Sequence, residues 1–154
     1  MTNPNPNPNP ILVTGAAGRS GGARGLLRAG LVFLAAVQFF VGCWALLFPR
    51  SFFDVPWVGM GMSYNAHLMM DYGAMSLATS VVLGVGAVTM RQTMVRTGLA
   101  VYLVFALPHL VIHIRLLHHL TAGQRVPLLT ALTAAVVIPV VLLGLTGPTR
   151  RDTP

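Results

Sequence analysis

Charged residues are scarce in this chain, and two charged residue types are absent. Only 8% of the 154 residues are charged, with no lysine and no glutamate. A soluble domain carries about 25% charged residues, so this composition, with 55% hydrophobic residues, excludes an ordinary soluble domain. The single cysteine, Cys43, excludes an intramolecular disulfide. The length allows about four membrane-spanning helices of about 20 residues and no soluble catalytic domain of normal size.

Four apolar segments are long enough to cross a bilayer. They cover about 29–48, 65–89, 95–117 and 126–145, within a membrane domain at 26–148. These lengths predict an all-α, polytopic membrane protein, a four-transmembrane-helix bundle. Residues 1–25 begin with an Asn-Pro repeat and are expected to form a disordered N-terminal tail. Residues 149–154 are expected to form a C-terminal tail.

The arginines lie at the ends of the predicted spans, so the basic charge is expected at a membrane surface. A formal net charge of +7 would favour nucleic acid in a soluble protein. Here seven arginines lie before the first span, between the second and third, or after the fourth: Arg19, Arg24, Arg28, Arg91, Arg96, Arg150 and Arg151. Arg50, Arg115 and Arg125 lie on the other side. Because cytoplasmic loops are enriched in arginine, we expect a multi-pass plasma-membrane protein with both termini in the cytoplasm. Its partner is then the lipid bilayer and not nucleic acid.

Four polar residues near the outer ends of two spans form the candidate site. His67 and Asp71 begin the second span, and His109 and His113 end the third. Each pair is spaced by four, so its members share one helix face. An acid within a membrane costs about 2.5–3.5 kcal/mol, so we expect Asp71 to face the bundle interior and to pair with His113 or His109. Three imidazoles and a carboxylate suit zinc, iron or copper, which makes the four residues a candidate metal site.

Several other interpretations of these four residues stay open. They fit a hydrogen-bonded network that fixes helix register, and they also fit haem ligation or a hydrogen bond to a quinone carbonyl. A proton relay is the fourth interpretation. It is weakened because the cytoplasmic half of the predicted bundle lacks ionisable residues. Metal and haem are therefore the candidate cofactors, and no catalytic residue is defined.

One face of the second span carries small residues at a spacing of four. Ser76, Ser80 and Gly84 would allow a neighbouring helix to approach closely. We therefore expect this face to meet a neighbour. A membrane-protein partner, or a second copy of the chain, is a candidate for that neighbour.

The sequence Ile-Leu-Val-Thr-Gly-Ala-Ala-Gly-Arg-Ser-Gly at 11–21 resembles the first strand and glycine turn of short-chain dehydrogenases and NmrA-like NAD(P)-binding proteins. That turn binds a dinucleotide only inside a parallel sheet, with an acid about 20 residues later. Here a membrane span follows directly and no acid precedes Asp54. We therefore expect no dinucleotide binding at this segment.

The stretch from Pro49 to His113, with Phe52, Phe53 and the runs at 64–74 and 105–113, resembles a family of small four-helix membrane proteins of unknown function, common in actinobacteria and loosely similar to DoxX-like proteins. In that family Asn-Glu-His-Leu is followed by an Arg-Asp pair. The matching residues are Asn65, His67, Leu68 and Asp71, whereas Ala66 and Met70 replace the Glu and the Arg. The resemblance implies the fold and a location for a site, and no established reaction.

The sequence thus favours a non-enzymatic or accessory membrane component with a His/Asp polar cluster near the extracytoplasmic side. The alternative is a metal-, haem- or quinone-binding membrane redox protein that uses His67, Asp71, His109 and His113.

Overall fold

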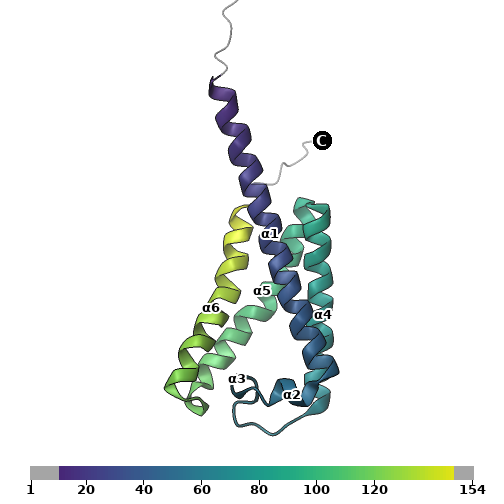
Figure 1. Ribbon diagram of the computed structural model, residues 1–154, viewed down its shortest axis with the longest axis vertical. Coiled ribbons are helices and arrows are strands. Elements are labelled where there is room, and N and C mark those ends of the chain that lie inside the picture. Colours follow the sequence, from purple (N-terminus) through teal and green to yellow (C-terminus); the bar gives the residue numbers. More distant parts are fainter. Residues whose placement is uncertain (1–10, 148–154) are drawn as a thin grey trace, which may run out of the picture.

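The computed structural model describes the backbone of residues 11–147 and the side chains of residues 21–147, and its regular elements are helices (Figure 1). In chain order they are α1 (Ile11–Leu47), α2 (Pro49–Phe53), α3 (Pro56–Gly59), α4 (Ala66–Thr89), α5 (Gln92–Arg115), the 3-10 helix η1 (Leu117–His119) and α6 (Ala122–Gly144). The predicted all-α architecture is confirmed over this range.

Four of these helices are long and apolar enough to cross a bilayer. The candidate spans are Gly21–Leu47 within α1, and the whole of α4, α5 and α6. The chain is therefore a multi-pass membrane protein built as a four-helix bundle, as the sequence predicts. The observed bounds differ from the predicted ones by a few residues, except at the start of the first span.

Helix α1 begins well before its predicted apolar segment. Its backbone is helical from Ile11, so residues 11–25, expected to belong to a disordered tail, lie in α1 in the structure. The side chains of the segment that resembles a dinucleotide-binding turn lie outside those described, apart from Gly21. The remainder of the predicted tail, residues 1–10, and the predicted C-terminal tail lie outside the described residues.

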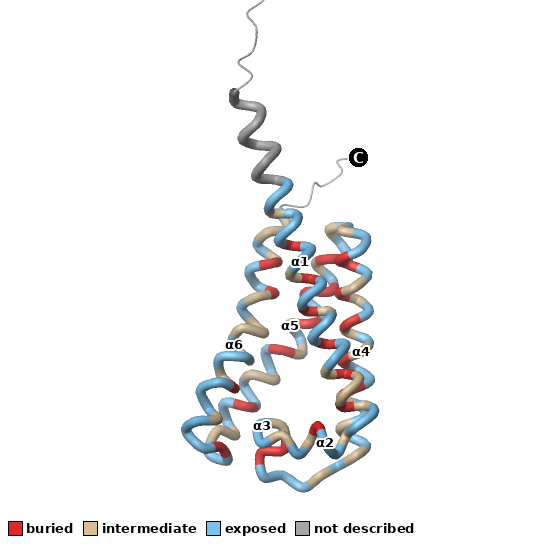
Figure 2. The backbone as a smooth tube through the Cα atoms, in the orientation of Figure 1, coloured by how far each residue is buried: buried red, intermediate tan, exposed pale blue. Residues whose placement is uncertain are grey.

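The main hydrophobic core lies in the half of the bundle that carries the chain ends (Figure 2). It joins Leu31 and Leu34 of α1 to Leu83 of α4, Leu99 of α5 and Leu142 of α6. Gln38 is also buried and lies against the Tyr102 side chain, which gives its amide a polar neighbour. A second, smaller cluster joins α3, η1 and α6 at the opposite end, through Met60, Leu120 and Leu128.

Among the described helices, α1 and α4 share the most extensive contact. The approach is closest at Gly42 and Gly73, where a Cβ atom on Gly73 would lie 2.9 Å from the carbonyl oxygen of Gly42. The same atom would lie 2.6 Å from the backbone nitrogen of Leu46. Only glycine allows two backbones to come this near.

The small-residue face predicted on the second span is only partly used in this packing. Ser76 and Ser80 are buried inside the chain, which confirms that they meet a neighbour. Gly84 is not part of the contact, because a Cβ atom there would meet nothing within 4 Å. The buried serines are therefore occupied by this chain's own helices and are not a free surface for another protein.

Candidate functional site

The four predicted site residues form two separate pairs. At the start of α4, His67 Nε2 lies 3.3 Å from Asp71 Oδ2, with side chains 83% and 63% exposed. On α5, the rings of His109 and His113 are 4.5 Å apart between centroids, edge to face. Among residues 21–147 no three His, Cys, Asp or Glu side chains gather closely enough to hold a metal ion.

The position of Asp71 differs from the expected one. The sequence predicts an inward-facing carboxylate paired with His113 or His109, whereas the carboxylate is mostly exposed and pairs with His67. The two residues are one turn apart on the same helix face. An exposed pair of this kind contributes about 0–1 kcal/mol.

The amino end of α4 is defined by its cap. The Asn65 side chain accepts a hydrogen bond from the Leu68 backbone N–H at 3.2 Å, which satisfies one of the unpaired donors of the first turn. The cap fixes where α4 begins, and with it the places of His67, Asp71 and Tyr72.

A row of aromatic rings leads from α1 to the histidines of α5, and sequence reasoning missed it. It begins with Phe40, whose ring lies against that of Trp44. The Trp44 ring centroid lies 5.4 Å from that of Phe52, and Tyr72 stacks on Phe52 at 5.7 Å. Tyr72 stacks in turn on His109 at 6.4 Å. The members of this aromatic row are Phe40, Trp44, Phe52, Tyr72, Phe105, His109 and His113.

The aromatic row draws on four helices. Phe40 and Trp44 come from α1, Phe52 from α2, Tyr72 from α4, and the remaining rings from α5. Within α5 the members are spaced by four, which places Phe105, His109 and His113 on one face. That spacing was visible in the sequence, whereas the contacts between helices were not.

His113 ends the row in a buried position. Its side chain is 9% exposed, and its Nδ1 atom is enclosed without a hydrogen-bond partner among the described residues. An unsatisfied buried polar atom costs about 1–3 kcal/mol. The fold therefore carries an energetic cost at the point where two imidazoles meet.

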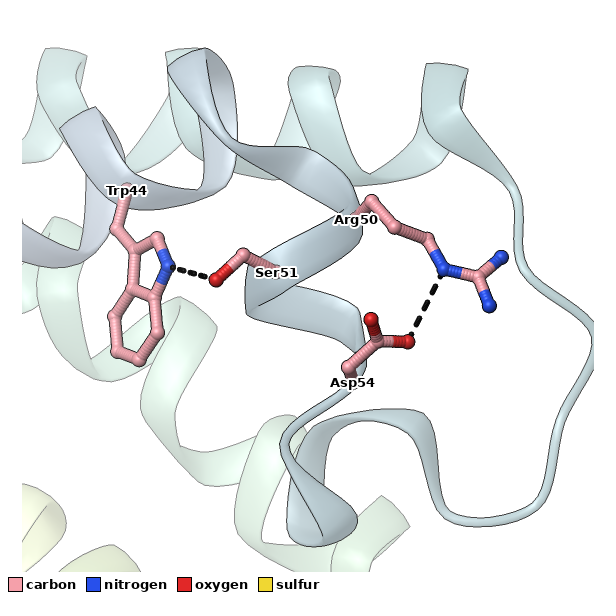
Figure 3. A network of polar contacts seen from close by, with 4 residues as sticks. All are labelled: Trp44, Arg50, Ser51 and Asp54. Carbon is pink, nitrogen blue, oxygen red and sulfur yellow. Dashed lines mark hydrogen bonds and ion pairs between the residues drawn. The ribbon is translucent and has the colours of Figure 1, made fainter.

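Polar contacts hold the corner between α1 and α2 beside the row (Figure 3). The Trp44 indole N–H donates to the Ser51 hydroxyl at 3.4 Å, and Arg50 Nε lies 3.1 Å from Asp54 Oδ1. The Arg50 guanidinium also lies over the Tyr64 ring, 4.9 Å from its centroid. These contacts orient α2, which brings Phe52 against Tyr72.

The last two histidines lie away from these groups. His118 and His119 belong to η1 and its end, are both exposed, and contact each other with ring centroids 3.9 Å apart.

The fold and the two histidine pairs define an integral membrane protein with a histidine-bearing aromatic row. Comparison with protein-family models, with curated proteins and with solved structures finds no match to this chain. The resemblances noted in the sequence therefore stay predictions.

Proposed function

We propose that this membrane protein binds a flat, lipid-soluble ring compound of the quinone type against His109 and His113. The observation that carries the proposal is the buried His113 imidazole, whose Nδ1 has no partner among the described residues. A ligand carbonyl or hydroxyl that hydrogen-bonds to this nitrogen would remove its cost of about 1–3 kcal/mol.

The chemistry of imidazole suits both forms of a quinone. In a neutral histidine one ring nitrogen donates and the other accepts a hydrogen bond. His113 can therefore donate to a quinone carbonyl as one tautomer and accept from a quinol hydroxyl as the other. The rings of Phe105 and Tyr72 stack on His109, so the imidazole pair lies beside aromatic side chains, which suit a flat, lipid-soluble ring compound.

The enclosure of Nδ1 sets a condition on binding. The atom has almost no contact with solvent, so a ligand reaches it only when the imidazole ring turns outward or its covering side chains move. Apolar ligands enter from the bilayer, and the exposed apolar residues Val111 and Ile112 beside His113 lie on the lipid-facing surface of α5.

The other interpretations have less support. The accessory role depended on the small-residue face of α4, and Ser76 and Ser80 are buried within the chain. A metal site needs three or four protein ligands, whereas the described residues offer two pairs. Haem ligation between two helices would use His67, which pairs with Asp71 at 3.3 Å.

The proposal predicts saturable quenching of Trp44 fluorescence by a short-chain quinone. In the Trp57→Phe background, Trp44 is the remaining tryptophan, and it lies in the aromatic row. We expect His113→Leu to weaken quinone affinity about tenfold, because a hydrogen bond of about 1.4 kcal/mol is lost. The measurement is a fluorescence titration of the purified protein in mild detergent.

His118→Leu is the matched control, because His118 is exposed and lies outside the row; it should bind like the parent. Equal affinity in His113→Leu and the parent would contradict the proposal. A fall in the melting temperature of His113→Leu, with unchanged quinone affinity, would assign His113 a structural role. Stoichiometric iron, copper or zinc by elemental analysis, lost in His113→Leu, would support the metal-binding alternative instead.

The orientation in the membrane rests on the arginine distribution. The loop between α4 and α5 carries Arg91, and the ends of the chain carry most of the other arginines, so the positive-inside rule puts these parts in the cytoplasm of a plasma-membrane protein. The loop before α4 is then extracytoplasmic, together with the amino end of α4 and the His67–Asp71 pair.

Cysteine labelling in intact cells tests this orientation. In a Cys43→Ala background, Ser63→Cys should react with a membrane-impermeant maleimide, because Ser63 is exposed in the loop before α4. Thr93→Cys, also exposed, should react only after cell lysis. The reverse pattern would place the termini outside.

A further inference from the structure

Two adjoining hollows lie at the end of the bundle that carries both chain ends. Their volumes are about 380 and 360 Å³, and both are lined by Arg24 and Met90. Arg28 of α1 lines one hollow, and Gln92 of α5 lines the other. We call the two together the terminal hollow.

Several polar groups near the terminal hollow are already engaged within the protein. The Gln92 amide donates to the carbonyl oxygens of Thr146 and Gly147, at 2.6 and 2.9 Å. Arg96 donates from Nε to the Thr146 hydroxyl at 2.9 Å and from a terminal nitrogen to the Gly147 carbonyl. These bonds tie the end of α6 to the start of α5, so one wall of the terminal hollow is held in place.

The two arginines from α1 are not engaged in this way. Arg24 and Arg28 are exposed, one turn apart, and within residues 21–147 neither has an ion pair or a side-chain hydrogen bond. The two carboxylates in this range, Asp54 and Asp71, lie at the opposite end of the bundle and are paired with Arg50 and His67. Within the described part of the chain, the positive charge of the terminal hollow is therefore uncompensated.

We infer that the terminal hollow binds the phosphate headgroup of an anionic phospholipid, with Arg24 and Arg28 contacting the phosphate. The hollow lies where the candidate span α4 ends at Thr89 and α5 begins at Gln92, and both residues line it; lipid headgroups meet the ends of spanning helices at this level. Arginine presents paired N–H donors that match phosphate oxygens. The exposed apolar side chain of Val88, which lines one of the two hollows, offers a contact for an acyl chain.

Native mass spectrometry of the full chain tests this inference, with phosphatidylglycerol titrated against phosphatidylcholine. We expect the parent to retain phosphatidylglycerol in preference to phosphatidylcholine. Because each arginine near an anionic headgroup contributes about 1 kcal/mol, Arg24→Gln and Arg28→Gln should each weaken phosphatidylglycerol binding roughly fivefold, and the double variant about thirtyfold. Arg24→Lys should keep most of the binding, since it keeps the charge. The matched control is Arg115→Gln, which removes an exposed arginine at the opposite end and should bind like the parent.

Three results would overturn the inference. The first is equal phosphatidylglycerol binding by the parent and the double variant. The second is displacement of phosphatidylglycerol by millimolar inorganic phosphate, which would assign the site to free phosphate. The third is a loss of thermal stability in Arg24→Gln that is the same in phosphatidylcholine and phosphatidylglycerol nanodiscs. That result would assign Arg24 a structural role that does not depend on the lipid headgroup.

Discussion

Replacing Gly73 by alanine is expected to destabilise the protein by about 1–3 kcal/mol or more, the cost of overpacking a close contact. The added methyl group would lie 2.6 Å from the backbone nitrogen of Leu46 and 2.9 Å from the carbonyl oxygen of Gly42. Both are backbone atoms, so neither can rotate away as the end of a flexible side chain could. Helices α1 and α4 would have to separate, and their shared interface would loosen along its length.

Thermal unfolding in mild detergent, followed by far-UV circular dichroism, measures this effect. Gly84→Ala is the matched control on the same helix, because a Cβ atom there meets nothing within 4 Å. Alanine within a helix is favoured over glycine by about 0.5–1 kcal/mol, so the control should melt at the parent temperature or above it. Equal melting of the two variants would show that the close approach of α1 and α4 is not needed for stability.

The four spans could be predicted from the sequence because lipid imposes one strong rule. Backbone groups in a bilayer must bond within their own helix, so an apolar run of sufficient length becomes a spanning helix. This rule did not predict where α1 starts. Residues 11–28 are rich in glycine and arginine, and hydropathy marks only the part of a helix that lies in lipid. A helix can continue beyond it, as α1 does from Ile11.

The contact between α1 and α4 shows which features of packing the residue pattern of a single helix does not predict. The spacing of Ser76, Ser80 and Gly84 correctly indicated a buried face for the two serines. It missed Gly73, whose closeness to Gly42 depends on where two helices cross. The point at which two helices cross depends on both segments, so it cannot be predicted from either one alone.

The contacts of the four candidate residues were predicted correctly within helices and incorrectly between them. Spacing by four predicted that His67 shares a face with Asp71, and His109 with His113, and both pairs are in contact. The expected pairing of Asp71 with His113 or His109 rested on their shared position near the outer ends of two spans, that is, on similar depth in the membrane. Depth does not give the direction in which a side chain points around the helix axis, and Asp71 points outward.

The aromatic row could not be foreseen for the same reason. Tyr72 joins Phe52 of α2 to His109 of α5, and these contacts require the corner after α1 to fold back beneath the bundle. Pro49 at the start of α2 indicated that the first span ends there. It did not indicate the angle at which α2 leaves, which the Trp44–Ser51 hydrogen bond helps to hold.

Leu99→Ala is expected to have an effect at least as large as Gly73→Ala. Leu99 is 0% exposed in the main core, and truncation of a buried leucine to alanine costs about 2–5 kcal/mol through lost transfer free energy and the cavity left behind. In a bilayer the loss of transfer free energy nearly vanishes, because lipid is as apolar as leucine. The expected loss is therefore about 2–3 kcal/mol, from the cavity and the lost packing contacts.

Val104→Ala is the control that distinguishes the loss of core packing from the loss of apolar side-chain surface. Val104 lies on the same helix as Leu99 and is 75% exposed toward lipid. With lipid able to fill the space, that substitution should leave the melting temperature nearly unchanged, whereas Leu99→Ala should lower it clearly. Both are measured by thermal unfolding in the same detergent. If the two variants melted together, the side chains around Leu31, Leu83 and Leu99 would not form a tightly packed core, and the stability of the bundle would come from its contact with lipid.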